Sequence, residues 1–180
     1  MRRRLFGPAR KTAILPLEIK RAHQLLTAGD FLAAAQAFED LARRAEEIGG
    51  PRAPIFLLQA GKARIFGGNL NAGMQHLKRG LTLLAERGQW MRMYHAGRRS
   101  VDELQQRGLT REAGEIESFL RSNLPALADL PTQRVEESAM LRLPTHCPAC
   151  GGPLRPNEVE WLSPESAECP YCASPVQAQV

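Results

Sequence analysis

Apolar residues recur at helical spacing through most of the chain. Between residues 31 and 48 they fall three and four positions apart, as is typical of an amphipathic helix; the positions are Phe31, Ala34, Phe38, Leu41, Ala42, Ala45 and Ile48. Glycines interrupt the pattern at short intervals, and helix ends commonly take glycine because it adopts a left-handed backbone without steric cost. The pattern predicts six helices, at about residues 16–28, 31–48, 54–66, 70–87, 89–106 and 110–122.

The connections between the predicted helices are short, so neighbouring helices are expected to be antiparallel and to form three helical hairpins. Gly29, Gly68 and Gly108 each lie at the turn inside a hairpin, 39 and then 40 residues apart. A period of this length, with two helices per unit, is typical of a helical repeat array. The sequence thus predicts a mainly α-helical fold over residues 16–122.

Small residues occur where the two helices of each hairpin would cross. They are Ala22 and Ala34 in the first unit, Gly61, Gly73 and Gly80 in the second, and Ala113 in the third. Together with the large Phe38 and Leu77 on the second helices, this arrangement resembles the tetratricopeptide repeat. The third unit departs from that family, with Val101 at a small position and Glu117 at a large one, and the period exceeds the family's value of about 34 residues. A generic helical bundle is the alternative fold.

The composition changes after residue 122. The rest of the chain holds all four cysteines and most of the prolines, whereas residues 16–122 contain few prolines. Prolines and glycines punctuate turns and loops, so the change marks a boundary. We therefore divide the chain into a flexible basic tail at 1–15, helical repeats at 16–122, a linker at 123–145 and a small β domain at 146–176.

The four cysteines form two short motifs of the same spacing near the C-terminus. Cys147 and Cys150 enclose Pro-Ala, and Cys169 and Cys172 enclose Pro-Tyr, with eighteen residues between the two pairs. This spacing is typical of a zinc site, because a two-residue gap lets one tight turn present two thiolates to a tetrahedral ion. We predict that these four cysteines hold one structural Zn²⁺ per chain, with Gly151 supplying a left-handed residue after the first pair.

Between the two cysteine pairs, residues 157–162 alternate in polarity like a β-strand. The whole segment resembles a zinc ribbon. The resemblance implies two metal-binding turns, here called knuckles, each formed by one cysteine pair and carried on a short hairpin, and a fold stabilised mainly by its metal. A redox dithiol or a pair of disulfides is the alternative use of the cysteines. His146, next to Cys147, could also replace a thiolate, although an exposed neighbour of the site is the simpler interpretation.

Charge is distributed unevenly. The chain carries 24 basic and 19 acidic residues; 21 of the basic and 12 of the acidic residues lie before residue 126. The C-terminal part is therefore acidic, and we expect that it could dock on the basic helices. Phosphate binding requires the opposite sign from this acidic segment. Association with nucleic acid through the basic tail and helices is therefore the second function that we consider.

The favoured function is a non-enzymatic interaction or adaptor module that binds a peptide or protein partner. Likeness to the tetratricopeptide repeat implies a groove lined by the first helix of each unit. The candidate partner-binding residues are His23, Leu58, Lys62, Arg98 and Asp102, with Trp161 of the β domain as a possible anchor. Lys62 and Arg98 would suit an acidic peptide or a carboxylate terminus.

Other function classes find little support in the sequence. It contains no glycine-rich phosphate loop, no His-Glu-x-x-His motif and no nucleophile elbow, so we do not expect an enzyme. It shows no apolar run of about eighteen residues and no export signal, so we expect a cytoplasmic protein without a membrane span. Nothing in the sequence fixes an oligomeric state.

Overall fold

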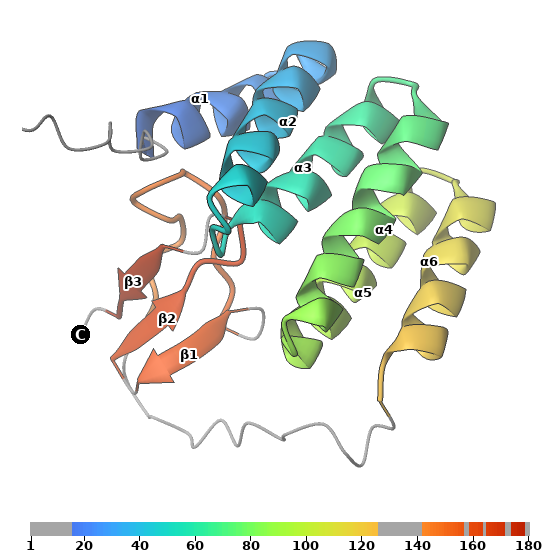
Figure 1. Ribbon diagram of the computed structural model, residues 1–180. Helices are drawn as coiled ribbons and strands as arrows, with labels where there is room; N and C mark the ends of the chain where they lie inside the picture. The colour runs from blue at the N-terminus through green and yellow to red at the C-terminus, as the bar shows by residue number, and fades with distance from the viewer. Residues whose placement is uncertain (1–15, 126–141, 157–158, 164, 172–173, 179–180) are drawn as a thin grey trace, which may run out of the picture.

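The computed structural model describes residues 16–125, 142–156, 159–163, 165–171 and 174–178. Within these residues the protein is mainly helical, as predicted, with six helices and one small sheet (Figure 1). The helices are α1 (Pro16–Thr27), α2 (Phe31–Glu47), α3 (Ala53–Phe66), α4 (Leu70–Glu86), α5 (Trp90–Gln106) and α6 (Thr110–Asn123). Their bounds agree with the predicted ranges to within one residue at each end.

The turns between helices show why the glycine spacing was informative. Gly29, Gly68 and Gly108 all have φ near +80°, at 81°, 87° and 76°, a conformation that side chains with a Cβ rarely adopt. Asp30 and Asn69 then cap the next helices, because each side chain accepts a hydrogen bond from a backbone N–H three residues later. Each turn therefore ends one helix and begins the next within three residues.

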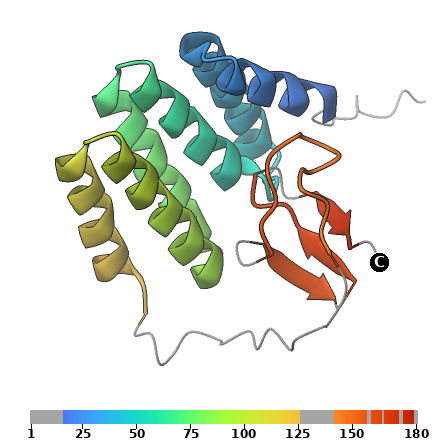
Figure 2. The same cartoon turned by 180° about the vertical axis from the view of Figure 1, so that it is seen from behind.

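The helices pack on their neighbours in the chain and also on the helix two positions away. Lys62 of α3 forms an ion pair with Glu103 of α5 at 2.5 Å, and Lys78 of α4 pairs with Glu115 of α6 at 3.1 Å. Glu39 of α2 accepts two hydrogen bonds of 2.7 Å from Arg64 of α3 and also lies 3.0 Å from His76 of α4. Odd-numbered and even-numbered helices thus line up as two rows (Figures 1 and 2).

Helices α3 and α4 cross so closely that their facing glycines leave no room for a side chain. A Cβ added at Gly61 would lie 2.8 Å from the carbonyl oxygen of Gly73 and 2.9 Å from the backbone nitrogen of Leu77. No real Cβ tolerates such distances to backbone atoms. The small residues that suggested a crossing in the second unit therefore have a steric reason to be there.

Three apolar clusters fill the interior of the described residues; the smallest is made of Ala34, Ala35 and Ala63, and the other two are large. One large cluster is built only from helices α3, α4, α5 and α6, with Leu81, Leu84, Met93, Val101 and Ile116 among its most deeply buried members. The other large cluster contains Ile19, Phe38, Leu41 and Phe56 of the first three helices, and it continues into the C-terminal segment. The C-terminal segment is thus packed on the helices and not held apart from them.

The sheet has three short antiparallel strands in the order β1 (Glu160–Ser163), β2 (Ser166–Glu168) and β3 (Pro175–Gln177). Trp161 faces Ala167, which in turn faces Val176. The predicted strand at 157–162 is found as β1, which begins later, at Glu160, because this is the first residue paired with β2. Asn157 and Glu158 lie outside the described residues.

The predicted tail at 1–15 and most of the predicted linker, residues 126–141, also lie outside the described residues. Residues 142–145 are described and take part in the C-terminal fold, since the Leu154 N–H donates to the Thr145 carbonyl at 2.9 Å. Among the helices described, none combines the length and the apolar character needed to cross a bilayer.

Candidate metal centre and the helical face beneath it

Three of the four predicted ligands come together. The Sγ atoms of Cys147, Cys150 and Cys169 all lie within 4.8 Å of one another. The three residues are 2%, 1% and 0% exposed. The fourth, Cys172, lies outside the described residues. Three buried thiols at this separation form a donor set that could bind a metal ion.

The two knuckles share one backbone plan. The N–H of Cys147 donates to the carbonyl of Gly152 at 2.7 Å, and the N–H of Cys169 donates to the carbonyl of Ser174 at 2.9 Å. In both turns the hydrogen bond joins residues five positions apart in the chain. The first turn also needs the left-handed residue predicted for it, and Gly151 has a φ of 74°. Tight closure explains how residues three apart in the chain can aim their sulfurs at one point.

The surroundings of the sulfurs suit thiolates. The backbone N–H of Gly152 points to Cys150 Sγ and that of Tyr171 points to Cys169 Sγ, both at 3.4 Å. N–H groups aimed at sulfur stabilise its negative form. The sulfurs of Cys150 and Cys169 are 3.8 Å apart.

That separation is longer than a disulfide bond and matches the spacing of two metal ligands. A disulfide would bring two sulfurs to about 2.05 Å. Ligands about 2.3 Å from a tetrahedral ion lie about 3.8 Å from each other, which is the edge of the tetrahedron. The observed distance between Cys150 and Cys169 therefore fits two ligands of one metal ion.

The candidate metal centre is embedded in the helical core. Its three cysteines, together with Leu154 and Val176, belong to the apolar cluster that contains Phe38 of α2 and Phe56 of α3. Figures 1 and 2 both place the sheet beside the lower ends of α1, α3 and α5. The C-terminal segment, residues 142–178, is called the C-terminal module below.

Polar groups reinforce this packing. Arg92 of α5 forms an ion pair with Glu168 of β2, in which the side chains are 15% and 18% exposed. Arg52, just before α3, donates to Ser174 Oγ at 3.0 Å. The basic helices and the acidic module therefore meet with complementary charges, as the charge distribution of the sequence suggested.

Tyr171 of the second knuckle contacts the helical face on two sides. Its ring meets the His23 ring of α1 edge-to-face, with centroids 6.0 Å apart. On another side the Arg99 guanidinium of α5 lies 5.9 Å from the ring centroid, within the range of a cation–π contact. One aromatic ring thus contacts two helices that do not adjoin each other in the chain.

The contact between module and helices is not completely filled. A cavity of about 40 Å³ lies between α3, α5 and the second knuckle. Its lining includes Pro170, Tyr171 and Gln59, and the Gln59 Oε1 atom is buried without a hydrogen-bond partner. The His23 Nε2 atom is also buried without a partner, and burial, aided by the Lys62 charge, lowers the pKa of His23 to about 4.

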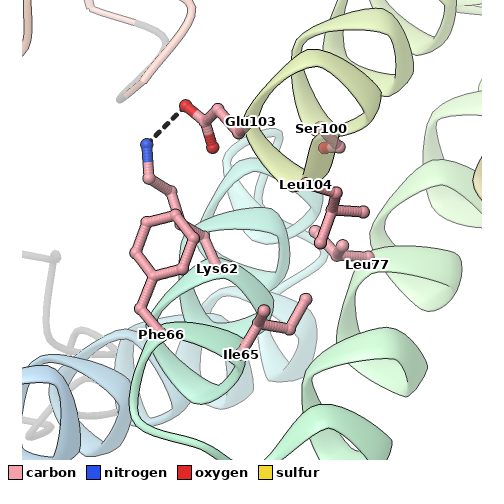
Figure 3. A pocket seen from close by; sticks show the side chains of 7 residues that line it. All are labelled: Lys62, Ile65, Phe66, Leu77, Ser100, Glu103 and Leu104. Carbon is pink, nitrogen blue, oxygen red and sulfur yellow. Dashed lines mark hydrogen bonds and ion pairs between the residues drawn. The ribbon is translucent and has the colours of Figure 1, made fainter. Parts of the chain in front are cut away.

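The structure scatters the predicted partner-binding residues over different environments. His23 and Leu58 are buried, each 8% exposed. Lys62 lies beside the Phe66 ring and points to Glu103, above a hollow of about 10 Å³ between α3 and α5 (Figure 3).

The other predicted contact residues lie nearer to solvent. Arg98 and Asp102 are exposed on α5 and form a loose ion pair at 3.9 Å, and Arg98 also reaches Glu117 of α6. Trp161 of β1 is half-buried, and its indole N–H donates to the Pro156 carbonyl at 3.3 Å. His146 is exposed and bonded to the Thr145 hydroxyl, so it lies beside the cysteine cluster without joining it.

Sequence reasoning missed the residues that join the two parts of the molecule. Arg52, Arg92, Arg99 and Tyr171 all contact across this boundary. The uneven charge of the chain was the one feature of the sequence that indicated this contact, and it identified no individual residue. Tyr171 was noted only as a member of its Cys-Pro-Tyr-Cys motif.

Comparison with known proteins adds one short resemblance. No family model and no solved structure matches the chain. A stretch of 43 residues is 44% identical to part of a DNA ligase from Prosthecochloris aestuarii. The stretch amounts to 23% of this chain and 6% of the ligase, so the chain spans only a small fraction of the relative that it matches.

Proposed function

We propose that the chain is a non-enzymatic interaction module, in which a tetratricopeptide-like array of three helical hairpins and a zinc ribbon form one unit that binds a protein or peptide. Cys147, Cys150, Cys169 and Cys172 hold one structural Zn²⁺. The ion has no reacting role in this proposal: it closes the two knuckles and neutralises their thiolates. The helices supply the surface on which a partner is bound.

The observation that carries the zinc assignment is the cluster of three buried sulfurs. Soft thiolates favour zinc over magnesium or calcium, which prefer oxygen ligands. Both C-x₂-C turns contribute, which leaves Cys172 as the natural fourth ligand. A set of four cysteines completes the tetrahedron and leaves no position for substrate, as in structural sites.

The array assignment is supported by the two rows of helices and by the tight Gly61–Gly73 crossing. Arrays of this kind present one row as a continuous surface. In this chain the row of α1, α3 and α5 carries basic side chains on its module side, among them Arg92 and Arg99. Such a surface suits an acidic segment of a partner.

The zinc assignment is tested by native mass spectrometry of protein purified under reducing conditions, before and after a chelator. We expect one zinc ion per chain, and thiols that react with alkylating agents only after chelation. A metal-free chain whose mass is lower by two hydrogens per cysteine pair would instead support disulfides.

The interaction role is tested by crosslinking of the tagged chain in its native cells, followed by affinity measurements with each crosslinked partner. We expect Arg98→Ala to weaken a partner bound along the first-helix row, with Arg111→Ala on exposed α6 as the matched control. Equal affinity of both variants for every partner would contradict this placement of the binding surface.

Association with nucleic acid is the second candidate function, because part of the chain is similar to a stretch of a DNA ligase. The basic tail and helices would then make phosphate contacts. Retention on immobilised DNA that weakens steeply with added salt would favour this role. Retention that is absent at low salt would exclude it.

A further inference from the structure

The contact between the C-terminal module and the helices is itself an example of what the helical face can bind. Residues 168–171 lie on the row of α1, α3 and α5, with Glu168 paired to Arg92 and Tyr171 set between His23 and Arg99. A carboxylate and an aromatic ring are thus recognised three positions apart. Two arginines of α5 provide the charge that attracts both groups.

We propose that the helical face beneath Tyr171 is a binding surface for an acidic protein segment that carries an aromatic residue three positions after a glutamate, and that residues 168–171 occupy this surface in cis. This inference rests on the proposed function as an interaction module, for which it names the chemistry of the partner. Binding of a partner then requires displacement of the second knuckle from α5.

The contact leaves polar groups and space on the helical face that the segment 168–171 does not use. Gln59 Oε1 and His23 Nε2 are buried there without hydrogen-bond partners, and each such atom costs free energy. The side chains around the cavity of about 40 Å³ beside Pro170 and Tyr171 lack van der Waals contacts on that side. A partner segment that donates a hydrogen bond to Gln59 and fills the cavity would bind better than the cis segment does.

The surface also extends beyond the residues that the module covers. Lys62, Ser100 and Glu103 line both the cavity at Tyr171 and a smaller hollow at Phe66, so the two hollows adjoin each other at the Lys62–Glu103 ion pair. Figure 3 shows the hollow at Phe66. A longer segment could follow the two hollows after its aromatic residue has replaced Tyr171.

The test uses the full chain with the cis contact weakened by Glu168→Gln and Tyr171→Ala together. The probe is a synthetic peptide of residues 165–171 with Cys169→Ser, and the control peptide carries the same two changes as the variant chain. Because a tethered segment competes at high effective concentration, we expect the probe to bind the variant at least tenfold more tightly than the unaltered chain. The control peptide should bind neither.

Matched substitutions locate the binding. Arg99→Ala in the variant chain should abolish probe binding, whereas Arg111→Ala on α6 should leave it unchanged. The proposal is wrong if a variant that retains zinc and helical circular dichroism binds the probe no better than the unaltered chain, or binds both peptides equally.

A second measurement covers the case in which the variant loses its metal or its fold. Excess probe added to the unaltered chain should raise hydrogen exchange in residues 165–178, and the control peptide should not; no change at saturating probe would overturn the proposal. A chain that binds zinc and captures a partner but ignores the probe refutes this inference alone. A chain without zinc refutes the zinc assignment, while probe binding is still measured separately.

Discussion

The two large apolar clusters of this protein are built on different principles. The cluster of α3 to α6 contains only helical residues, so each helix buries one continuous stripe against the next. The cluster beneath the C-terminal module joins Ile19, Phe38 and Phe56 to three cysteines and to Val176 of β3. The first can form from local helical packing, whereas the second is complete only when distant segments and their thiols meet.

The difference predicts where the molecule is vulnerable. The sheet has three strands of three or four residues, far too few apolar side chains to fold alone. Its deepest residues, Ala167 and Val176, are small. Stability of the module must therefore come from the metal centre and from the helices, and loss of either affects the second cluster before the first.

The largest effect should follow loss of the metal. Cys150→Ser removes a buried sulfur, and the free energy of structural zinc binding, about 10 kcal/mol or more, is largely folding free energy in small metal-bound domains. We expect the module to unfold and hydrogen exchange to rise in residues 142–178 and in α1, while α4, α5 and α6 stay protected. Hydrogen-exchange mass spectrometry measures this directly.

A chelator should reproduce the effect in the unaltered chain and cause no further change in the Cys150→Ser variant. A uniform rise of exchange in all six helices would show that the two clusters form one cooperative unit. Protection of the module after complete removal of metal would show that the helices alone hold it.

The next largest effect should come from the helical side of the comparison. Gly61→Ala places a methyl group against α4, where two of the three nearest atoms belong to the backbone and cannot move aside, and should destabilise the fold by about 3 kcal/mol. Gly114→Ala is the matched control, since a Cβ there meets nothing within 4 Å. This control should stabilise α6 by about 0.5–1 kcal/mol. Chemical denaturation of both variants gives the two values, and a loss of stability in both would refute the steric argument.

The ion pair between Arg92 and Glu168 links the two regions and should have a smaller effect. A double-mutant cycle of Arg92→Ala and Glu168→Ala should give a coupling free energy of about 2 kcal/mol, because both side chains are largely buried. The exposed pair Arg98–Glu117 provides the comparison, with an expected coupling below about 0.5 kcal/mol. Equal couplings would mean that the module is not held by this contact.

The two regions also differ in how far the sequence could predict them. The helices were located to within a residue, because their turns depend on glycines with positive φ and their faces on a local period. The three described cysteines were identified by spacing alone, because a chelating turn leaves little freedom in spacing. Local patterns of this kind are visible in the chain itself.

The docking of the module was not predictable in this way. It depends on single side chains such as Arg92, Arg99 and Tyr171, which come from elements about 70 to 80 residues apart in the chain and obey no period. The position of His23, one of the groove residues inferred from family likeness, was not predictable for the same reason. His23 is covered by a segment that the family pattern does not contain.

The smallest effect concerns the link between the helical rows at Glu39. The Arg64 guanidinium, which donates two hydrogen bonds, holds the pKa of Glu39 below its usual range, with His76 adding to the effect. A carboxyl whose pKa is lower in the folded state contributes stability that is complete above its ordinary value of about 4.3 and is lost as the pH falls through the lowered folded value.

Glu39→Gln should therefore cost about 1 kcal/mol at pH 7, a modest value because the pair is about a quarter exposed. The difference between variant and unaltered chain should vanish at low pH. Urea denaturation at pH 7 and at pH 3 measures both values. Because acid also releases thiolate-bound metal, unfolding is followed in helices α4 to α6, whose stability we expect not to depend on zinc. A difference in stability that persists undiminished at pH 3 would show that Glu39 stabilises the helical rows through packing. The contact among α2, α3 and α4 would then be held by side-chain packing and not by charge.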